Sequence, residues 1–178
     1  DELIICMSSI PSRIRDGMLL LSGDVMLLFN PLQIDYSGTG AAAISFKEDV
    51  DTGKDHGVFL GSEKGDVRRF LHKQSVEDLR ACGAVNDRGA VDIDTGAVIF
   101  SPQMLESLYS LISTDELYDK YVNETVRLSL YGDFLYPLAM DSTLEQFYLE
   151  KPEGEFSPEL REARTAVWNA LHQYSLKL

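Results

Sequence analysis

The hydrophobic pattern predicts a strand near the start of the chain. Residues 17–25 contain a run of four apolar side chains without a charge, bounded by Gly17 on one side and by Gly23 and Asp24 on the other. An apolar run between turn residues is typical of a strand that is buried on both faces of an α/β sheet. Ligands of such sheets bind outside the carboxyl ends of the strands, so Asp24 is the first candidate for a functional residue.

The rest of the pattern predicts strands that alternate with helices. Apolar or alternating stretches predict strands over residues 41–46, 58–60, 67–73, 91–100 and 126–130. Serine or threonine caps before amphipathic runs predict helices over residues 75–83 and 101–111, after 113–114, and from 157 onward. This alternation favours the α/β class, in a three-layer, Rossmann-like fold with a mostly parallel mixed sheet.

The length of the chain predicts a single domain. With 178 residues, of which 44% are hydrophobic and 25% charged, the chain can bury one sizeable core. Apolar residues at helical spacing in residues 1–16 have no cap before them, so we expect this segment to be the tail of a helix that begins upstream. Residues 157–178 are predicted to form a C-terminal helix. The domain is therefore expected to be truncated at its N-terminus.

The net charge and the cysteine count limit the possible partners. A formal charge of −13 argues against nucleic acid, because binding to the phosphate backbone needs a basic surface. The apolar runs are far shorter than the roughly 20 residues that span a bilayer, and no signal peptide opens the chain, so we expect a cytoplasmic protein without a membrane partner. Cys6 and Cys82 are too few for a disulfide framework and lack metal-ligand spacing.

Two places suggest a site for a phosphorylated ligand, and each has a simpler interpretation. Asp24 can hold a divalent metal or can bond its own backbone in a turn. The cluster of Arg68, Arg69 and Lys73 is the densest group of cations in an acidic chain and can bind a phosphate, or it can be a solvated strand face. The residues alone leave these alternatives open.

Two further places carry weaker signals. Asp94-Thr95-Gly96 can be a simple turn, with Gly96 present for its backbone angle. Asp133 follows a glycine and is favoured as the N-cap of a short helical run that ends near residue 139. The histidines His56 and His72 have no nucleophile in a recognisable arrangement, so a hydrolase triad is unsupported.

Several of these segments, taken in order, resemble the L-fucokinase and GDP-fucose pyrophosphorylase family. The likeness covers about residues 17–139 and rests on five short motifs in register: Gly23-Asp24-Val25, His56-Gly57-Val58-Phe59, Arg69-Phe70-Leu71-His72-Lys73, Asp94-Thr95-Gly96 and Leu130-Tyr131-Gly132-Asp133-Phe134-Leu135. Each motif is weak alone. Five in the same order are specific enough to indicate the family.

The resemblance implies a nucleotidyltransferase-like domain that transfers GMP from GTP to L-fucose 1-phosphate, giving GDP-L-fucose and pyrophosphate. Asp24 and Lys73 would be catalytic, with Asp24 on Mg²⁺ and Lys73 on the sugar phosphate. Asp94 and Gly96 would contact the sugar. The roles implied for the remaining residues are substrate binding for Arg69 and His56, and a second place near the metal for Asp133. Transfer at phosphorus moves negative charge among oxygens, which a metal ion and a cation stabilise.

Two departures from the family's pattern suggest a different role. No Gly-rich loop follows a strand and opens a helix, and Gln74 stands where a proline commonly follows the lysine. We therefore expect a fragment with little activity of its own, covalently linked in the parent protein to a kinase domain of the GHMP type. The alternative function is a non-catalytic sugar-binding or regulatory module of such an L-fucokinase. A third possibility is an acidic interaction domain without a ligand.

Overall fold

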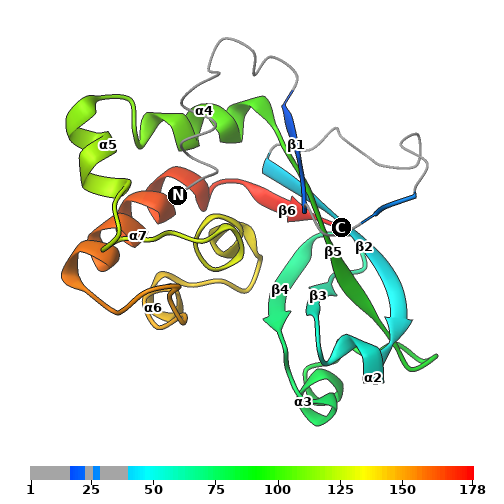
Figure 1. Cartoon of the computed structure of the whole chain (residues 1–178). Helices are drawn as coiled ribbons and strands as arrows, with labels where there is room; N and C mark the ends of the chain where they lie inside the picture. The colour runs from blue at the N-terminus through cyan, green and yellow to red at the C-terminus, as the bar shows by residue number, and fades with distance from the viewer. Residues whose placement is uncertain (1–16, 23–25, 29–39) are drawn as a thin grey trace.

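The computed structural model describes residues 17–22, 26–28 and 40–178. Its described part forms a six-stranded sheet in the order β4-β3-β5-β2-β6, with β1 paired to β5 (Figure 1). The strands are β1 (Met18–Leu21), β2 (Gly40–Asp49), β3 (Gly57–Gly61), β4 (Val67–His72), β5 (Ala90–Phe100) and β6 (Ser175–Lys177). The predicted α/β class is confirmed, because helices flank this mixed sheet.

The helices lie between and after the strands. They are α2 (Val50–Gly53), α3 (Val76–Ala81), α4 (Pro102–Ser110), α5 (Asp115–Tyr121), the π-helix η3 (Leu130–Leu135), the 3-10 helix η4 (Tyr136–Leu138), α6 (Leu144–Phe147) and α7 (Pro158–Leu171). The serines predicted as caps at positions 75, 101 and 157 each accept an amide N–H of the first helical turn, as expected. No helix in the described part is long and apolar enough to cross a bilayer.

The prediction of a mostly parallel, Rossmann-like sheet is wrong. Every pairing within the described sheet is antiparallel except that of β2 with β6. The five-residue connection 62–66 joins β3 to β4 as antiparallel neighbours, whereas a parallel pair needs a crossover of a dozen or more residues. β6, which forms the one parallel pairing of the described sheet, follows all the helices of the second half of the chain.

Three other predictions of elements need correction. β1 is not fully buried, because Leu19 and Leu21 are 48% and 55% exposed and β5 is the only described strand that pairs with β1. The predicted strand over residues 126–130 is not a strand, and its last residue begins η3. The C-terminal helix ends at Leu171, after which Ser175–Lys177 form β6. The predicted tail of an upstream helix, residues 1–16, lies outside the described residues.

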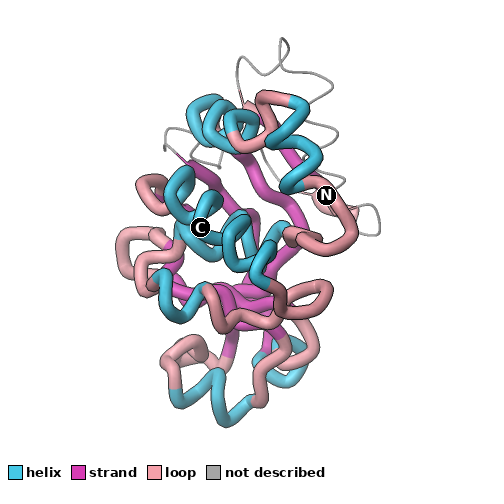
Figure 2. The backbone as a smooth tube through the Cα atoms, turned by 90° about the vertical axis from the view of Figure 1, so that its left-hand side faces the viewer, coloured by secondary structure: helices cyan, strands magenta, loops and turns pink. Residues whose placement is uncertain are grey.

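The sheet packs a core on each face. The larger cluster includes Phe59, Phe100 and Phe134 and lies under α4, α6, α7 and the two η-helices, which Figure 2 shows in front of the strands. The smaller cluster includes Val58 and Leu79 and packs beneath α2 and α3. Neighbouring residues of a strand point to opposite faces, so the two clusters lie on opposite sides of the sheet.

A bulge bends the central strand pair. In the pairing of β2 with β5, Ile44 faces Ala97 but the next residue, Ser45, faces Asp94. Thr95 and Gly96 are therefore extra residues on β5, and the Thr95 hydroxyl donates to the carbonyl oxygen of Ile44 at 2.6 Å. A bulge of this kind re-aims side chains and interrupts pairing.

Candidate functional site

Two short strands meet at this bulge. On the edge of β5 opposite β2, β1 pairs with residues 97–100 and β3 pairs with residues 92–93. The end of β1 and the start of β3 therefore lie on either side of Asp94-Thr95-Gly96. The Ser22 N–H donates to the Gly96 carbonyl oxygen at 2.8 Å, which ties the segment leading to Asp24 to the bulge.

The backbone at Gly96 requires glycine. Its φ is +71°, a left-handed conformation, and a Cβ there would lie 2.6 Å from the Cβ of Ser22. The Gly96 N–H donates to Oδ1 of Asp94 at 3.0 Å. Residues 94–96 are therefore a bulge within β5 and not the predicted turn, and this bulge orients the Asp94 carboxylate and admits the end of β1.

An aromatic stack covers Asp94. The centre of the Phe70 ring is 4.8 Å from that of the Tyr131 ring and 6.3 Å from that of the His72 ring, and in both pairs the ring planes are nearly parallel. A Cβ on Gly57 would lie 2.5 Å from an atom of the Phe70 ring and 3.4 Å from the Cβ of Asp94. Glycine at the start of β3 thus lets Phe70 pack close to Asp94.

Asp94 and Tyr131 change each other's acidity. Burial raises the pKa of the Asp94 carboxyl, while hydrogen bonds from Tyr131 and from the Gly96 N–H act against this rise. Burial, and then the hydrogen bond and charge of Asp94, raise the pKa of the Tyr131 phenol. Tyr131 therefore remains a neutral hydroxyl that donates to the carboxylate.

His56 and Lys73 lie next to this cluster. The Lys73 N–H donates to the His56 carbonyl oxygen at 3.1 Å, just beyond the pairing of His72 with Gly57. Both side chains are exposed. Lys73 has a φ of +49°, a left-handed conformation that costs a residue other than glycine about 1–2 kcal/mol. The structure thus places four predicted residues near the bulge in the middle of β5, where β3 begins: His56, Lys73, Asp94 and Gly96.

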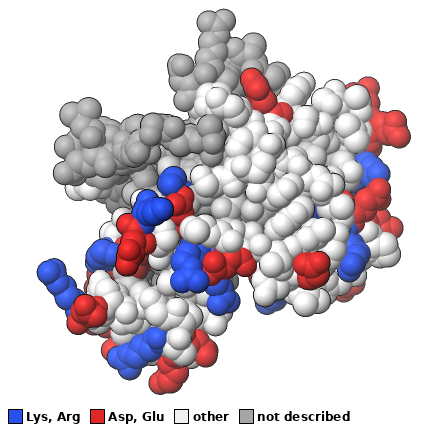
Figure 3. All heavy atoms as spheres, turned by 180° about the vertical axis from the view of Figure 1, so that it is seen from behind, with Lys and Arg blue, Asp and Glu red and all other residues white. Residues whose placement is uncertain are grey.

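The ion pairs of the described surface leave part of the predicted cation cluster without an acidic partner. On the face shown in Figure 3, positive and negative side chains are interspersed over the lobe that carries α2 and α3. Several cations form ion pairs, among them Lys47 with Asp92, Arg68 with Asp141 and Lys120 with Glu162. Arg69 and Lys73 form no ion pair with any residue that the structure describes. These two remain the cations available to an anionic ligand from the predicted cluster.

Arg69 does not lie in the Asp94 cluster. It lines a separate cavity between β4 and residues 136–150, on which Phe70 also borders. Arg68, the neighbour of Arg69 on β4, is held by Asp141 at 2.8 Å. The predicted group of three cations is therefore divided between two places.

Asp133 is buried in an ion pair. It is 0% exposed, its Oδ1 accepts from Nε of Arg164 at 2.8 Å, and its Oδ2 accepts from the Ser129 N–H at 2.7 Å. Nη1 of Arg164 also donates to the carbonyl oxygens of Phe147 and Glu150. Ser129, not Asp133, is the N-cap of η3. The pair thus joins η3, α6 and α7 inside the core.

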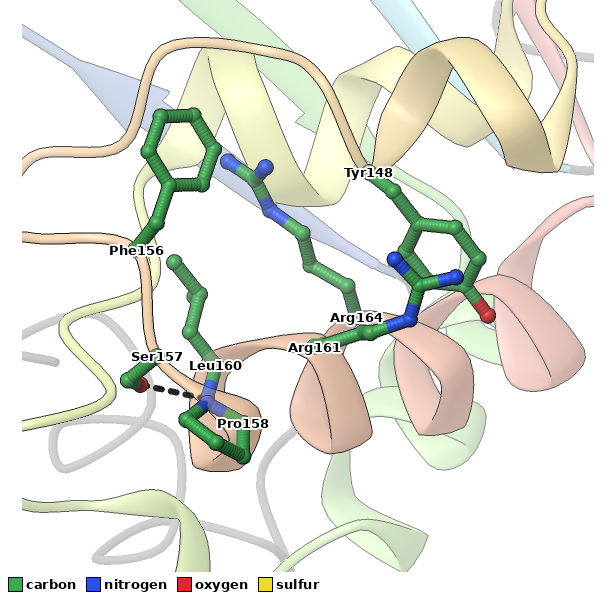
Figure 4. A pocket seen from close by; sticks show the side chains of 7 residues that line it. All are labelled: Tyr148, Phe156, Ser157, Pro158, Leu160, Arg161 and Arg164. Atoms are coloured by element: carbon green, nitrogen blue, oxygen red, sulfur yellow. Dashed lines mark hydrogen bonds between the residues drawn. The ribbon is translucent and has the colours of Figure 1, made fainter.

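Arg161, one turn earlier on α7, offers a contrast to Arg164. Figure 4 shows its guanidinium above the Tyr148 ring, 3.8 Å from the ring centre, while Arg164 extends away from Tyr148. Arg161 is exposed and Arg164 is 1% exposed. The two arginines of one helix therefore have different roles, one on the surface and one in the core.

The described carboxylates do not fit a magnesium site. Asp133 offers no free oxygen, and no group of three or more His, Cys, Asp or Glu side chains converges in the part of the chain that the structure describes. Asp24 lies outside the described residues. The metal site therefore stays a prediction that rests on Asp24.

Three residues of the cluster were not assigned roles from the sequence. Gly57, Phe70 and Tyr131 stand inside the motifs that carry the resemblance, next to His56, Lys73 and Asp133. The sequence marks these three residues only by their place in the motifs, because the motifs' charged residues are the more obvious candidates for binding and catalysis. The contacts that reveal them join segments distant in sequence.

The fold and this cluster define an α/β domain with a polar site where β1 and β3 meet on β5. The whole chain, residues 1–178, matches the family model described as the fucose pyrophosphorylase domain. The chain therefore belongs to the fucose pyrophosphorylase domain family, which confirms the resemblance seen in the sequence. At this level it is a domain of a fucose-related, nucleotidyltransferase-type enzyme. A comparison with the curated proteins gave no match.

Proposed function

We propose that this domain serves the transfer of GMP from GTP to L-fucose 1-phosphate. A phosphate oxygen of the sugar phosphate attacks the α-phosphorus of GTP, and the bond from that phosphorus to the bridging oxygen of the β-phosphate breaks. The products are GDP-L-fucose and pyrophosphate. The attacking oxygen is already anionic, so the step needs no oxidant and no general base.

The observation that carries the proposal is that Lys73 and Asp94 both lie beside the start of β3: the Lys73 N–H donates to the His56 carbonyl oxygen, and Asp94 lies next to Gly57. A cation beside the incoming phosphate offsets the charge that two phosphorylated substrates bring together. A carboxylate fixed by Gly96 and Tyr131 can accept hydrogen bonds from sugar hydroxyls. We assign Lys73 to the sugar phosphate, and Asp94 and Gly96 to the sugar.

The strained backbone of Lys73 adds support. Left-handed residues other than glycine persist only where the surroundings hold them, and they are enriched at functional sites. Here the hydrogen bond to the His56 carbonyl oxygen and the start of α3, capped by Ser75, hold the conformation on both sides. The lysine side chain thus starts from a fixed backbone position, which favours alignment of two substrates. His56, on the other side of that bond, is assigned to substrate binding.

The test is to replace Lys73 in the natural protein that carries this chain. Lys73→Ala is expected to lower kcat/KM for pyrophosphate release by about 100-fold, equal to about 2.7 kcal/mol of transition-state stabilisation. Lys64→Ala, at an exposed lysine between β3 and β4, is the matched control and should leave the rate unchanged. Equal activity of both variants would refute the proposed role of Lys73.

The second candidate is a sugar-binding or regulatory module attached to a GHMP-type kinase domain. It is favoured by the burial of Asp133, which removes one of the two carboxylates expected near the metal. Under this function, the natural protein would bind GDP-fucose or fucose 1-phosphate through Asp94 but release no pyrophosphate from GTP. Binding lost in Asp94→Ala, together with no turnover, would select this function over the transferase.

A further inference from the structure

A cavity of about 260 Å³ lies between β4 and residues 136–150, which include η4 and α6. Its lining residues are Arg68, Arg69, Phe70, Tyr136, Ala139, Asp141, Ser142, Gln146, Leu149 and Glu150. Asp94, Tyr131 and Lys73 are not among them. The cavity is therefore a separate place from the Asp94 cluster, although Phe70 borders on both.

Three titratable side chains in this cavity lack partners. In the part of the chain that the structure describes, Arg69, Glu150 and Tyr136 form no side-chain hydrogen bond and no ion pair. Other polar groups of the lining are satisfied: Arg68 binds Asp141 at 2.8 Å, and the Ser142 hydroxyl donates to the Ala139 carbonyl oxygen at 2.7 Å. Polar groups that converge on a cavity without partners are the usual mark of a ligand site.

Electrostatics link these groups to one another. Burial raises the pKa of the Glu150 carboxyl, and the charges of Arg164 and Arg69 oppose that rise. Burial and the charge of Glu150 raise the pKa of the Tyr136 phenol, which Arg69 and Arg164 oppose. A guanidinium, a carboxylate and a phenol therefore share one small, partly desolvated volume.

The chemistry of the three groups restricts the ligand. A guanidinium binds the paired oxygens of a phosphate or carboxylate, and a carboxylate accepts hydrogen bonds from hydroxyl groups. Pockets for drug-sized ligands have volumes of about 300–1,000 Å³, so this one suits a smaller molecule. The Phe70 ring supplies an apolar wall of the kind that can pack against a sugar ring.

We propose that this cavity is a second ligand site, which binds a small polyhydroxylated anion of the size of a monosaccharide phosphate. Arg69 takes the anionic group, and Glu150 and Tyr136 take hydroxyl groups. This site does not depend on the proposed transferase function, because no residue of the Asp94 cluster except the shared Phe70 wall contributes to it. The competing interpretation is that Arg69 and Glu150 close onto each other as an ion pair and leave no room for a ligand.

The test is calorimetric titration of the 178-residue chain, without nucleotide or metal, with three probes: L-fucose 1-phosphate, L-fucose and inorganic phosphate. The sugar phosphate should bind at least about tenfold more tightly than either part alone, a difference of about 1.4 kcal/mol. Arg69→Gln should weaken the sugar phosphate and inorganic phosphate by about tenfold but not L-fucose. Glu150→Gln should weaken the sugar phosphate and L-fucose but not inorganic phosphate.

Three control variants make the assignment specific. Arg68→Gln removes a cation from the same wall that is already paired with Asp141, and it should change the affinities less than about twofold. Lys64→Ala and Arg88→Gln each remove an exposed cation outside both sites, and they should leave the three affinities unchanged.

Three outcomes would overturn the proposal. The first is that none of the probes binds. The second is that binding is lost in Asp94→Asn or Lys73→Ala and kept in Arg69→Gln, which would move the ligand to the other cluster. The third is that Arg69→Gln and Glu150→Gln lower thermal stability equally without altering any affinity, which would identify a closed ion pair.

Discussion

The Tyr131 hydroxyl hydrogen-bonds the Asp94 carboxylate, and this contact joins η3 to the bulge of β5. Tyr131 is held in place by its stacking on Phe70, and Asp94 is held by the Gly96 N–H. The carboxylate is thus held from two directions in the middle of β5, near the start of β3. Its protonation state can be followed without any assumption about the reaction.

Removal of the Tyr131 hydroxyl should make Asp94 a weaker acid. The hydrogen bond from Tyr131 favours the ionised carboxylate, so Tyr131→Phe keeps the aromatic stack but raises the pKa of Asp94 further above its ordinary value. Carboxyl-detected NMR titration measures this shift. Tyr118→Phe, on α5, is the control and should leave the Asp94 titration unchanged.

Replacement of Asp94 should change the pH dependence of stability. An acid whose folded pKa lies above its unfolded value ionises first in the unfolded chain, so its burial lowers stability as pH rises through that interval. The unfolding free energy of Asp94→Asn should therefore rise relative to that of the wild type as pH rises from 3.8 through the folded pKa of Asp94. Below pH 3.8 the stability difference between the two proteins should no longer change with pH. Urea unfolding at a series of pH values measures it. A pH-independent difference would show that the burial of this carboxyl has no such effect.

Lys73→Gly separates backbone strain from function. Glycine relieves a left-handed penalty of about 1–2 kcal/mol but increases the entropy of the unfolded chain, so a net gain of about 0.5–1 kcal/mol in unfolding free energy is expected. Arg127→Gly is the matched control, because Arg127 is the other described non-glycine residue with positive φ, at +41°, and is also exposed. Both variants should gain stability in urea, and only Lys73→Gly should lose pyrophosphate release.

The sequence allowed good predictions where the physical cause is local. The caps at Ser75, Ser101 and Ser157 depend on a side chain and an amide three residues away, and all three were found. Hydrophobic periodicity predicts strands but not their partners in the sheet. The prediction of a mostly parallel sheet was therefore wrong about how the strands pair. Asp133 and Arg164 are far apart in the sequence, and no residue near Asp133 indicates that they form an ion pair.

The cluster around Asp94 was predicted only in part for the same reason. The sequence points to charged residues at the ends of predicted strands, and the structure places His56, Lys73, Asp94 and Gly96 near the start of β3. The neutral residues that position them, Tyr131 and Phe70, act through stacking between distant segments. The open cavity beside Arg69 depends on Glu150, which arrives from another part of the chain.

The buried pair of Asp133 and Arg164 should dominate the stability of the helical half. Arg164→Ala leaves a buried carboxylate without its partner, which costs about 3–5 kcal/mol. Arg161→Ala is the control on the same helix, since loss of an exposed cation–π contact with Tyr148 costs about 0.5–1 kcal/mol. Chemical unfolding measures both. In the double variant Asp133→Asn, Arg164→Met the loss should be smaller than the sum of the two single losses, because no buried charge remains.

The close approach of Ser22 to Gly96 should make Gly96 hard to replace. Gly96→Ala must place a Cβ 2.6 Å from the Cβ of Ser22 and adopt a φ of +71°, whereas Gly83→Ala adopts a similar φ of +79° with nothing within 4 Å. Gly83→Ala should therefore lose about 1–2 kcal/mol of unfolding free energy from its backbone alone. Gly96→Ala should lose more, because the end of β1 must also move away from the bulge.

Hydrogen exchange locates the difference: the Ser22 amide, which donates to the Gly96 carbonyl oxygen, should lose protection in Gly96→Ala and keep it in Gly83→Ala. Equal losses of stability with unchanged protection at Ser22 would mean that β1 is not held by this contact.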